Sequence, residues 1–229
     1  DTSSVTTMYG MFEGATSADP DVSNWNTSSV TIMEDMFSGA TSANPNVSNW
    51  DTSSVTTMYG MFEGATSANP NVSNWDTSSV WDMSYMFSGA TSADPDVSGW
   101  DTSSVNEMYL MFSGATSADP DVSNWDVSSL WSGDWSGAYQ AFDNSNLSTE
   151  NYDALLINWA AQSPNLNSGV YLGASGVNYC NGESARNDTL IDTHSWVITD
   201  AGKDCPSAFN VVEPSWSSGF DLHDTLGNT

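Results

Sequence analysis

Five consecutive segments of 25 residues share one sequence pattern, and this regularity restricts the possible fold more than any other feature. Each segment reads (D/N)TSSVxxMxxMFxGATSA(D/N)P(D/N)VS(N/G)W, without insertion or deletion. A short fixed period predicts a solenoid of stacked coils instead of a globule around one central core. The five segments are Asp1–Trp25, Asn26–Trp50, Asp51–Trp75, Asp76–Trp100 and Asp101–Trp125.

The apolar spacing at the start of each coil predicts a short strand. The Val-x-x-Trp-x-Thr spacing matches the frame of a leucine-rich repeat. Trp50 and Thr52 are two residues apart, so both are expected to face the interior of the coil. Asn49, Asp51 and Ser53 alternate with them and are expected to face solvent.

A short helix is predicted to follow this strand. Val55, Met58, Met61 and Phe62 occupy positions i, i+3, i+6 and i+7, which is a helical stripe, and Gly64 is well placed to end it. Stacked coils would bring like residues together, so core packing explains the methionine pairs better than a copper site does. The fold class expected is therefore an α/β solenoid with a short parallel strand and a short helix in each coil, closed by a disulfide-bonded α+β cap.

The repeat pattern is lost after Ser128, and three parts are expected. Residues 1–128 form the repeat array (five full repeats and the start of a sixth), 129–205 a C-terminal capping region, and 206–229 an extension or linker. Trp131 and Trp135 are expected to cover the end of the core. The first coil has no cap, so its bare end is expected to be covered by other residues or to pair with a second copy. Because the chain begins at a repeat boundary without Met, it is expected to be a piece of a longer protein.

The capping region contains recognisable elements. A helix is predicted over Thr149–Ala161, capped by Ser148 or Thr149. A second helix is expected over Ser184–His194 and a short strand over Trp196–Thr199. The apolar face of the first helix consists of Tyr152, Leu155, Leu156 and Trp159.

The two cysteines, Cys180 and Cys205, are both in the capping region. An even pair in an acidic chain with the character of a secreted protein predicts one disulfide. No C-x-x-C or Cys/His pattern accompanies them, which argues against a zinc site.

The charge balance limits the partners of this protein. The chain has two basic residues (Lys and Arg together) and 29 acidic residues (Asp and Glu together), which gives a formal net charge of −27. Nucleic acids and anionic membrane surfaces both require basic residues and are excluded. No stretch is long and apolar enough for insertion into a membrane. The charge fits cations, a saline medium or a neutral or basic partner, and solubility alone is the alternative.

One acidic row opens the repeats. It contains Asp51, Asp76 and Asp101, each followed two residues later by Ser. These carboxylates are candidates for ligand binding. The alternative is an Asx-type bond from each carboxylate to nearby backbone amides, which Asn26 at the same repeat position could also form.

A second polar row flanks the proline of each repeat. Its two members change together between Asp and Asn, which suggests that they share one function, and calcium takes oxygen ligands of this kind. The sequence therefore predicts a Ca²⁺ site that ties successive coils together, with turn formation and recent repeat duplication as alternatives. The candidate ligands are Asp19, Asp21, Asn44, Asn46, Asn69, Asn71, Asp94, Asp96, Asp119 and Asp121.

A third row is aromatic and occupies variable positions between the invariant apolar residues. Exposed aromatic side chains on a repeat surface stack on sugars or anchor a protein partner, and a half-buried structural role is the alternative. The row contains Tyr9, Tyr59, Trp81, Tyr85 and Tyr109, of which the last four are candidate ligand-binding residues.

Catalysis is not expected. Arg186, His194 and Lys203 are all in the capping region, but no nucleophile motif accompanies His194. Arg186 and Lys203 are expected to pair with carboxylates of the cap.

The sequence resembles the BspA-like leucine-rich repeats of bacterial surface proteins. The resemblance rests on the motif WDTSSVTxMxxMFxGATS in the repeats and on three later segments, Leu147–Trp159, Tyr179–Arg186 and Ile191–Cys205. It implies a secreted or cell-surface, extracellular module, often part of a large adhesin, and it implies no enzymatic activity.

The function expected is adhesion or ligand binding along the repeat surface, with calcium stiffening the stack. The expected partner is a protein, peptide or glycan of a host or neighbouring-cell surface. A purely structural spacer is the first alternative. Ice binding is the second, because a regular threonine row is present, although the predicted strand turns it inward. That row is Thr2, Thr27, Thr52, Thr77 and Thr102.

Overall fold

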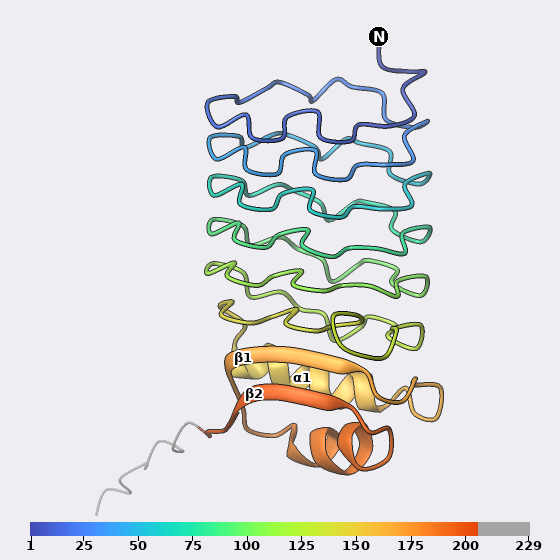
Figure 1. Ribbon diagram of the computed structural model, residues 1–229, viewed down its shortest axis with the longest axis vertical. Coiled ribbons are helices and arrows are strands. Elements are labelled where there is room, and N and C mark those ends of the chain that lie inside the picture. Colours follow the sequence, from blue (N-terminus) through green and yellow to red (C-terminus); the bar gives the residue numbers. More distant parts are fainter. Residues whose placement is uncertain (206–229) are drawn as a thin grey trace, which may run out of the picture.

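The computed structural model describes residues 1–205, and the linker predicted over 206–229 lies outside them. From the N-terminus at the top of Figure 1, the chain descends through a regular stack of coils and ends in a small region with helices and two strands. Its regular elements are the helix α1 (Thr149–Ala160), the strand β1 (Tyr171–Tyr179), the π-helix η1 (Ala185–Ile191) and the strand β2 (Val197–Lys203). The predicted solenoid of 25-residue coils is confirmed.

The interior of the stack consists of parallel columns of like side chains. Tryptophan rings of successive coils lie 6.2–6.5 Å apart and nearly parallel. Phenylalanine rings form a second column at 5.3–5.9 Å, which ends at Phe142. Each core tryptophan from Trp50 to Trp125 also donates its indole N–H to a valine carbonyl one coil earlier, at 3.0–3.1 Å. This bond satisfies a polar group that would otherwise be buried without a partner.

Backbone hydrogen bonds join each coil to the next along one side. Four amide groups of a coil donate to four carbonyl groups of the following coil, and a single parallel β-bridge, such as Thr57–Asp82, marks the register. In the third coil the donors are Met58, Gly60, Phe62 and Gly64, and the acceptors are Asp82, Ser84, Met86 and Ser88, at 2.7–3.0 Å.

The predicted strand is not formed, although its side-chain orientation is correct. Trp50 and Thr52 are 4% and 1% exposed, whereas Asn49, Asp51 and Ser53 are exposed. The segment lies between two turns because the carboxylate of Asp51 accepts the amide of Ser53 at 3.1 Å. Such local side-chain bonds compete with a strand ladder.

The predicted helix is also not formed. Residues 58–64 make a series of turns, in which Gly60 and Gly64 have φ of 58° and 62°. A left-handed residue interrupts a right-handed helix. Alternate amides donate to the next coil, and those between them, of Met61 and Glu63, donate to the carbonyls three residues earlier. The apolar residues Val55, Met58, Met61 and Phe62 are nevertheless all buried, as predicted.

The coil pattern continues beyond residue 129 after a longer loop. Met108, Leu110 and Phe112 donate to the carbonyls of Gly137, Tyr139 and Ala141 as earlier coils donate to their successors. Trp131 and Trp135 do not cover the core. They are 51% and 67% exposed, because the loop carries them away from the stack.

Helix α1 closes the core in their place, with Ser148 as its N-cap and all four predicted apolar residues buried. Trp159 of α1 donates its indole N–H to Val122 at 2.9 Å and so extends the tryptophan bonding pattern by one step. The amide of Ser148 donates to Asp119 at 2.8 Å. The cap is therefore matched to the repeat register by specific polar groups.

Strands β1 and β2 are parallel, with Tyr171 opposite Val197, and Ala138 of the preceding coil is bridged to Leu172. The strand predicted over Trp196–Thr199 corresponds to the first part of β2, and β1 was not predicted. The second predicted helix appears as η1, which is shorter than expected.

The predicted disulfide between Cys180 and Cys205 is confirmed, with a Cα–Cα distance of 4.8 Å. In the described part of the chain, no helix has the length and apolar character needed to cross a membrane.

Candidate functional site

The first acidic row forms turns. Asp51 accepts both the amide and the hydroxyl of Ser53, and the carboxylates of Asp76 and Asp101 make the same pair of bonds. The serine hydroxyl bonds are 2.6 Å long. These bonds lower the pKa of Asp51 and Asp101, first through the serine hydroxyl and then through its amide. The geometry agrees with the Asx-type alternative for this row.

The two members of each proline-flanking pair have different roles. The first accepts a backbone amide from the following coil, as Asp19 does from Asn44 and Asp94 from Asp119. The second forms a local turn, as Asp96 does with the amide and hydroxyl of Ser98. Both tasks need one acceptor oxygen, which Asp and Asn both supply. The paired change between Asp and Asn therefore does not require a shared ligand.

A calcium titration tests these carboxylates directly. Because their oxygens already accept protein hydrogen bonds, we expect the melting temperature in millimolar calcium to match that in equimolar magnesium. Among residues 1–205, no three His, Cys, Asp or Glu side chains are grouped so that they could hold a metal ion. A melting temperature that rises with calcium and not with magnesium would instead support the predicted Ca²⁺ site, since ligands of the folded state stabilise it by mass action.

The threonine row considered for ice binding is internal. Thr27, Thr52, Thr77 and Thr102 are each 1% exposed. Their hydroxyls donate to backbone carbonyls of the next coil at 2.9 Å. These four threonines therefore cannot present their hydroxyls to a crystal surface.

Three members of the predicted aromatic row form a continuous series, which extends further along the chain than the sequence suggested. Tyr59, Tyr85 and Tyr109 contact one another with ring centroids 5.3 and 5.0 Å apart. The contacts continue to Tyr139 and Tyr171, each step being 5.8 Å. All five rings are half-buried, so each presents one part to solvent. We call these five residues the tyrosine row.

Other aromatic side chains lie beside the tyrosine row or apart from it. Trp135 contacts Tyr109 and Tyr139 at 6.0 and 5.4 Å. Trp81 is 41% exposed, and no aromatic contact joins it to the row within residues 1–205. Tyr9 is 60% exposed and likewise has no aromatic neighbour there.

Tyr139 and Tyr171 were not predicted from the sequence as members of the row, and Trp135 was predicted to cover the core end instead. Tyr139 corresponds to the position of Tyr109 in the next coil, since Leu110 donates its amide to the Tyr139 carbonyl. The longer loop before it hid that correspondence. Aligning Ala138-Tyr139 with Met108-Tyr109 would have revealed it, whereas Tyr171 is placed only by the pairing of β1.

Asp35 and Glu63 lie near Tyr59, at the N-terminal end of the tyrosine row, and the pKa of each carboxyl is raised. Burial raises the pKa of Asp35, with added repulsion from Glu13 and Glu34. Burial and then Asp35 raise the pKa of Glu63. Burial, followed by a hydrogen bond with Tyr85, raises the pKa of Tyr109 to about 12. The Tyr109 phenol is therefore neutral at physiological pH.

These shifts predict that the fold becomes more stable on mild acidification. A carboxyl whose pKa is raised in the folded state binds its proton more readily there, so stability increases as the pH falls through the folded pKa of Asp35, Glu63 and Glu107. Asp51 and Asp101, whose pKa values are lowered, contribute stability above their unfolded value of 3.8 and lose it below.

We expect the urea midpoint to rise from pH 7 to about pH 4.5 and to fall below about pH 3.5. Replacement of Glu63 by glutamine should reduce the rise on the acidic side of neutrality. A midpoint that falls steadily from pH 7 downward would contradict this expectation.

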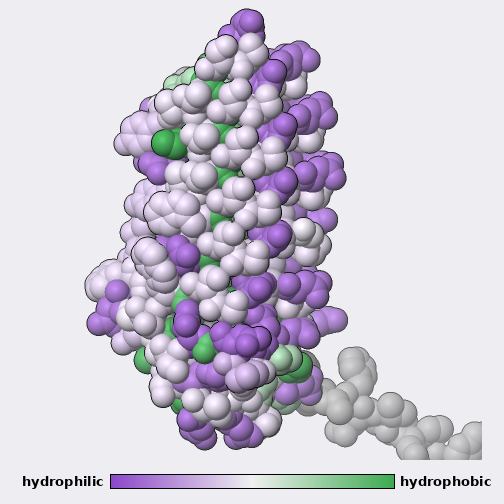
Figure 2. Space-filling model, turned by 90° about the vertical axis from the view of Figure 1, so that its right-hand side faces the viewer, coloured by the Kyte–Doolittle hydropathy of each residue, from purple (hydrophilic) through white to green (hydrophobic). Residues whose placement is uncertain are grey.

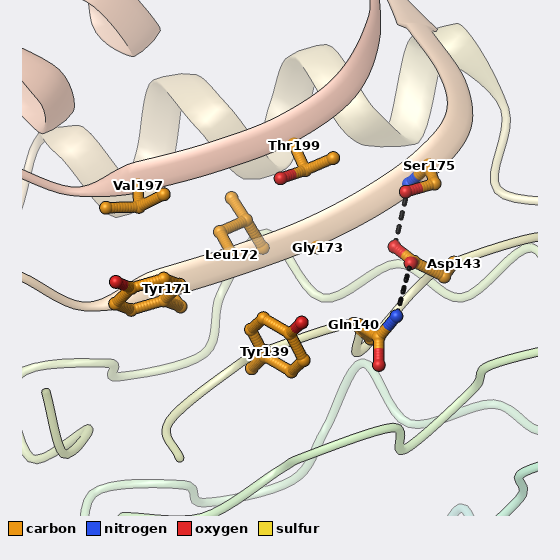
Figure 3. Close-up of a pocket in the computed structure, with 9 residues that line it drawn as sticks. All are labelled: Tyr139, Gln140, Asp143, Tyr171, Leu172, Gly173, Ser175, Val197 and Thr199. Atoms are coloured by element: carbon orange, nitrogen blue, oxygen red, sulfur yellow. Dashed lines mark hydrogen bonds between the residues drawn. The ribbon is translucent and has the colours of Figure 1, made fainter. Parts of the chain in front are cut away.

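A small cavity lies at the C-terminal end of the tyrosine row. Its volume is about 90 Å³, and Figure 3 shows Tyr139 and Tyr171 on one side of it and Gln140, Asp143 and Ser175 on the other. The remaining lining comes from Leu172, Gly173, Val197 and Thr199.

The polar residues of the cap are used in structural contacts. Arg186 pairs with Asp200 at 2.7 Å and Lys203 pairs with Glu183, as predicted. His194 is 7% exposed and its Nε2 lies 2.9 Å from the hydroxyl of Ser163. No carboxylate contacts the other ring nitrogen of His194 within the described residues, so the geometry assembles no Ser-His-Asp triad there.

The fold and its surface define a class: a repeat protein with a core of stacked aromatic columns, a continuous outer row of tyrosines and a disulfide-bonded α+β end. Residues 1–73 and 42–153 match a family model described as "Mycoplasma protein of unknown function, DUF285". The chain belongs to this DUF285 family. No curated protein and no solved structure matches the chain significantly.

Proposed function

We propose that this chain is a non-enzymatic, extracellular adhesion module that binds a neutral glycan along the tyrosine row. We also propose that it belongs with the BspA-like leucine-rich-repeat surface proteins, on the strength of the repeat motif. The observation that carries the binding function is the continuity of the row. Five half-exposed tyrosine rings in consecutive contact extend from the third coil to β1.

The physical character of this surface supports an elongated ligand. Aromatic rings offer large apolar contact area and a hydroxyl group at low entropic cost, because they have few rotatable bonds. Rings that touch their neighbours form a strip without gaps, which suits a chain molecule better than a compact one. Figure 2 shows hydrophilic groups repeating at regular intervals along one edge of the stack.

Charge limits the ligand further. Both basic side chains of the protein are in the cap and are paired with Asp200 and Glu183. The stack itself therefore carries only negative formal charges and would repel an anionic polymer. A neutral glycan meets neither a charge penalty nor a need for cationic partners.

Binding of neutral hexasaccharides such as cellohexaose and chitohexaose tests the proposal. Tyr59→Ala and Tyr109→Ala are each expected to weaken binding about tenfold, since anchoring aromatic residues contribute most of the binding energy at an interface. Tyr9→Ala removes the same side chain at the same repeat position, outside the row, and is expected to have no effect. Isothermal titration calorimetry measures the affinities.

Three outcomes separate the alternatives. Equal loss of affinity in Tyr59→Ala, Tyr109→Ala and the control Tyr9→Ala would show that the tyrosine row is not the binding site. Binding of a lysine-rich peptide and of no glycan would identify a protein partner. Absence of binding to any probe would favour the structural spacer.

A further inference from the structure

The cavity at the end of the tyrosine row combines an aromatic wall with a polar one. Tyr139 and Tyr171 approach it from one side, and Leu172, which is 1% exposed, forms its floor. The opposite wall carries the carboxylate of Asp143, the amide of Gln140 and the hydroxyl of Ser175 (Figure 3). A hexopyranose has the same division, with C–H groups on its faces and hydroxyls around its rim.

Asp143 is the buried carboxylate with the fewest hydrogen bonds in the described part of the chain. It is 6% exposed and accepts only the amide of Ser175 at 2.8 Å and the side chain of Gln140 at 3.3 Å. Asp153 is equally buried and accepts three backbone amides at 2.8–2.9 Å. Asp200 is held by Arg186, Tyr152 and its own turn.

A buried carboxylate that accepts only two hydrogen bonds, as Asp143 does, can be stabilised by additional hydrogen-bond donors. A buried charge is costly unless hydrogen bonds compensate it, and neither basic side chain of the protein is available to Asp143. Asp143 lines the cavity, and each of its two carboxylate oxygens accepts one hydrogen bond and can accept another, so a ligand with hydroxyl donors would add to these bonds. Hydroxyl groups supply such donors without introducing a charge.

The tyrosine row ends at this cavity. The register places Val197 and Thr199 of β2 opposite Tyr171 and Gly173, so the next position along the row is aliphatic. The volume of about 90 Å³ is far below the roughly 300 Å³ of pockets for drug-sized ligands, so the cavity holds part of one sugar unit and not a longer segment. A chain lying on the row would therefore place one terminal unit here.

We infer that this cavity is the subsite for the terminal sugar residue of the neutral glycan, with Asp143 accepting hydroxyl donors and Tyr139 and Tyr171 contacting the C–H face of the ring. This inference rests on the proposed function and adds an end-specific contact to it. Gln140 donates its side-chain amide to the carboxylate of Asp143 at 3.3 Å and so positions that carboxylate.

The test titrates the full chain with single sugars (glucose, galactose, mannose and N-acetylglucosamine) and with cellohexaose and chitohexaose. Saturation-transfer NMR detects the weak single sugars and calorimetry measures the hexasaccharides. Asp143→Asn preserves the shape and the acceptor for Ser175 but replaces one acceptor oxygen by a donor. Asp96→Asn is the matched control, because Asn46 and Asn71 already occupy that repeat position.

Asp143→Asn and Tyr171→Ala are expected to abolish the single-sugar signal and to weaken hexasaccharide binding at least about tenfold. Tyr109→Ala should weaken only the hexasaccharides. Circular dichroism identifies any variant that fails to fold. If Asp143→Asn fails to fold, Tyr171→Ala still tests the subsite, because the ring of Tyr171 is half-exposed and its removal disturbs the fold less.

Two results would overturn the inference in distinguishable ways. Hexasaccharide binding that is lost in Tyr109→Ala but unchanged in Asp143→Asn and Tyr171→Ala would refute the terminal subsite and leave the proposed function intact. Absence of binding to all six probes by the unmodified chain would refute both.

Discussion

Replacement of Trp75 by alanine is expected to lower the free energy of unfolding by about 4 kcal/mol, as truncation of a buried tryptophan does. Trp75 is 4% exposed and its ring lies between those of Trp50 and Trp100, at 6.4 and 6.5 Å. Its indole N–H donates to the carbonyl of Val47 at 3.1 Å, so the substitution also leaves a buried acceptor without that donor. Urea unfolding monitored by circular dichroism measures the loss.

The same substitution at Trp25 provides the control. Trp25 holds the same repeat position in the first coil, but it is only partly buried and stacks on the tryptophan column from one side. We expect a distinctly smaller loss there. Equal losses at the two positions would show that stability does not depend on coil-to-coil stacking, against expectation for a solenoid.

Replacement of Arg186 by alanine is expected to destabilise the cap by about 3 kcal/mol, because it leaves a buried charge without its partner. The side chain of Asp200 is 2% exposed and accepts from Arg186 at 2.7 and 3.2 Å. The hydroxyl of Tyr152 donates to the same carboxylate at 2.9 Å, but this one neutral hydrogen bond does not replace the charge and the two hydrogen bonds of the guanidinium. Thermal unfolding followed by tryptophan fluorescence measures the effect.

Lys203 supplies the matched control, since it is the other basic residue and also forms an ion pair. Its pair with Glu183 is exposed on both sides, at 46% and 49%. Exposed pairs of this kind contribute little, so Lys203→Ala is expected to leave the melting temperature nearly unchanged. A large loss at Lys203 together with a small loss at Arg186 would contradict the burial argument.

Much of the interior was predictable because burial follows from side-chain chemistry. The inward orientation of Trp50 and Thr52 and the apolar stripe from Val55 to Phe62 were assigned correctly. The backbone geometry was not, because a three-residue spacing of apolar side chains suits both a helix and a series of four-residue turns closed by bonds from residue i+3 to residue i. The left-handed residue at Gly60 and the amide donors to the next coil distinguish the two.

The candidate site was only partly predictable. Tyr59 and Tyr109 occupy the same repeat position and Tyr85 occupies the next one, yet the three rings meet because a side chain reaches across neighbouring coils. The contribution of Tyr171 depends on the parallel register of β1 and β2, which are joined through η1. The cavity beside Asp143 arises where the last coil and these strands come together.

The sequence by itself determined the period, the identity of the stacked columns, the acidic character of the surface and the disulfide. Each depends on residue type and spacing, which are local properties of the chain. Only the tertiary structure decided the path of the backbone within a coil, the exposure of Trp131 and Trp135, and the extent of the tyrosine row. These depend on which amides and rings meet across coils, since partners from different coils satisfy the hydrogen bonds and contacts that no single repeat can satisfy alone.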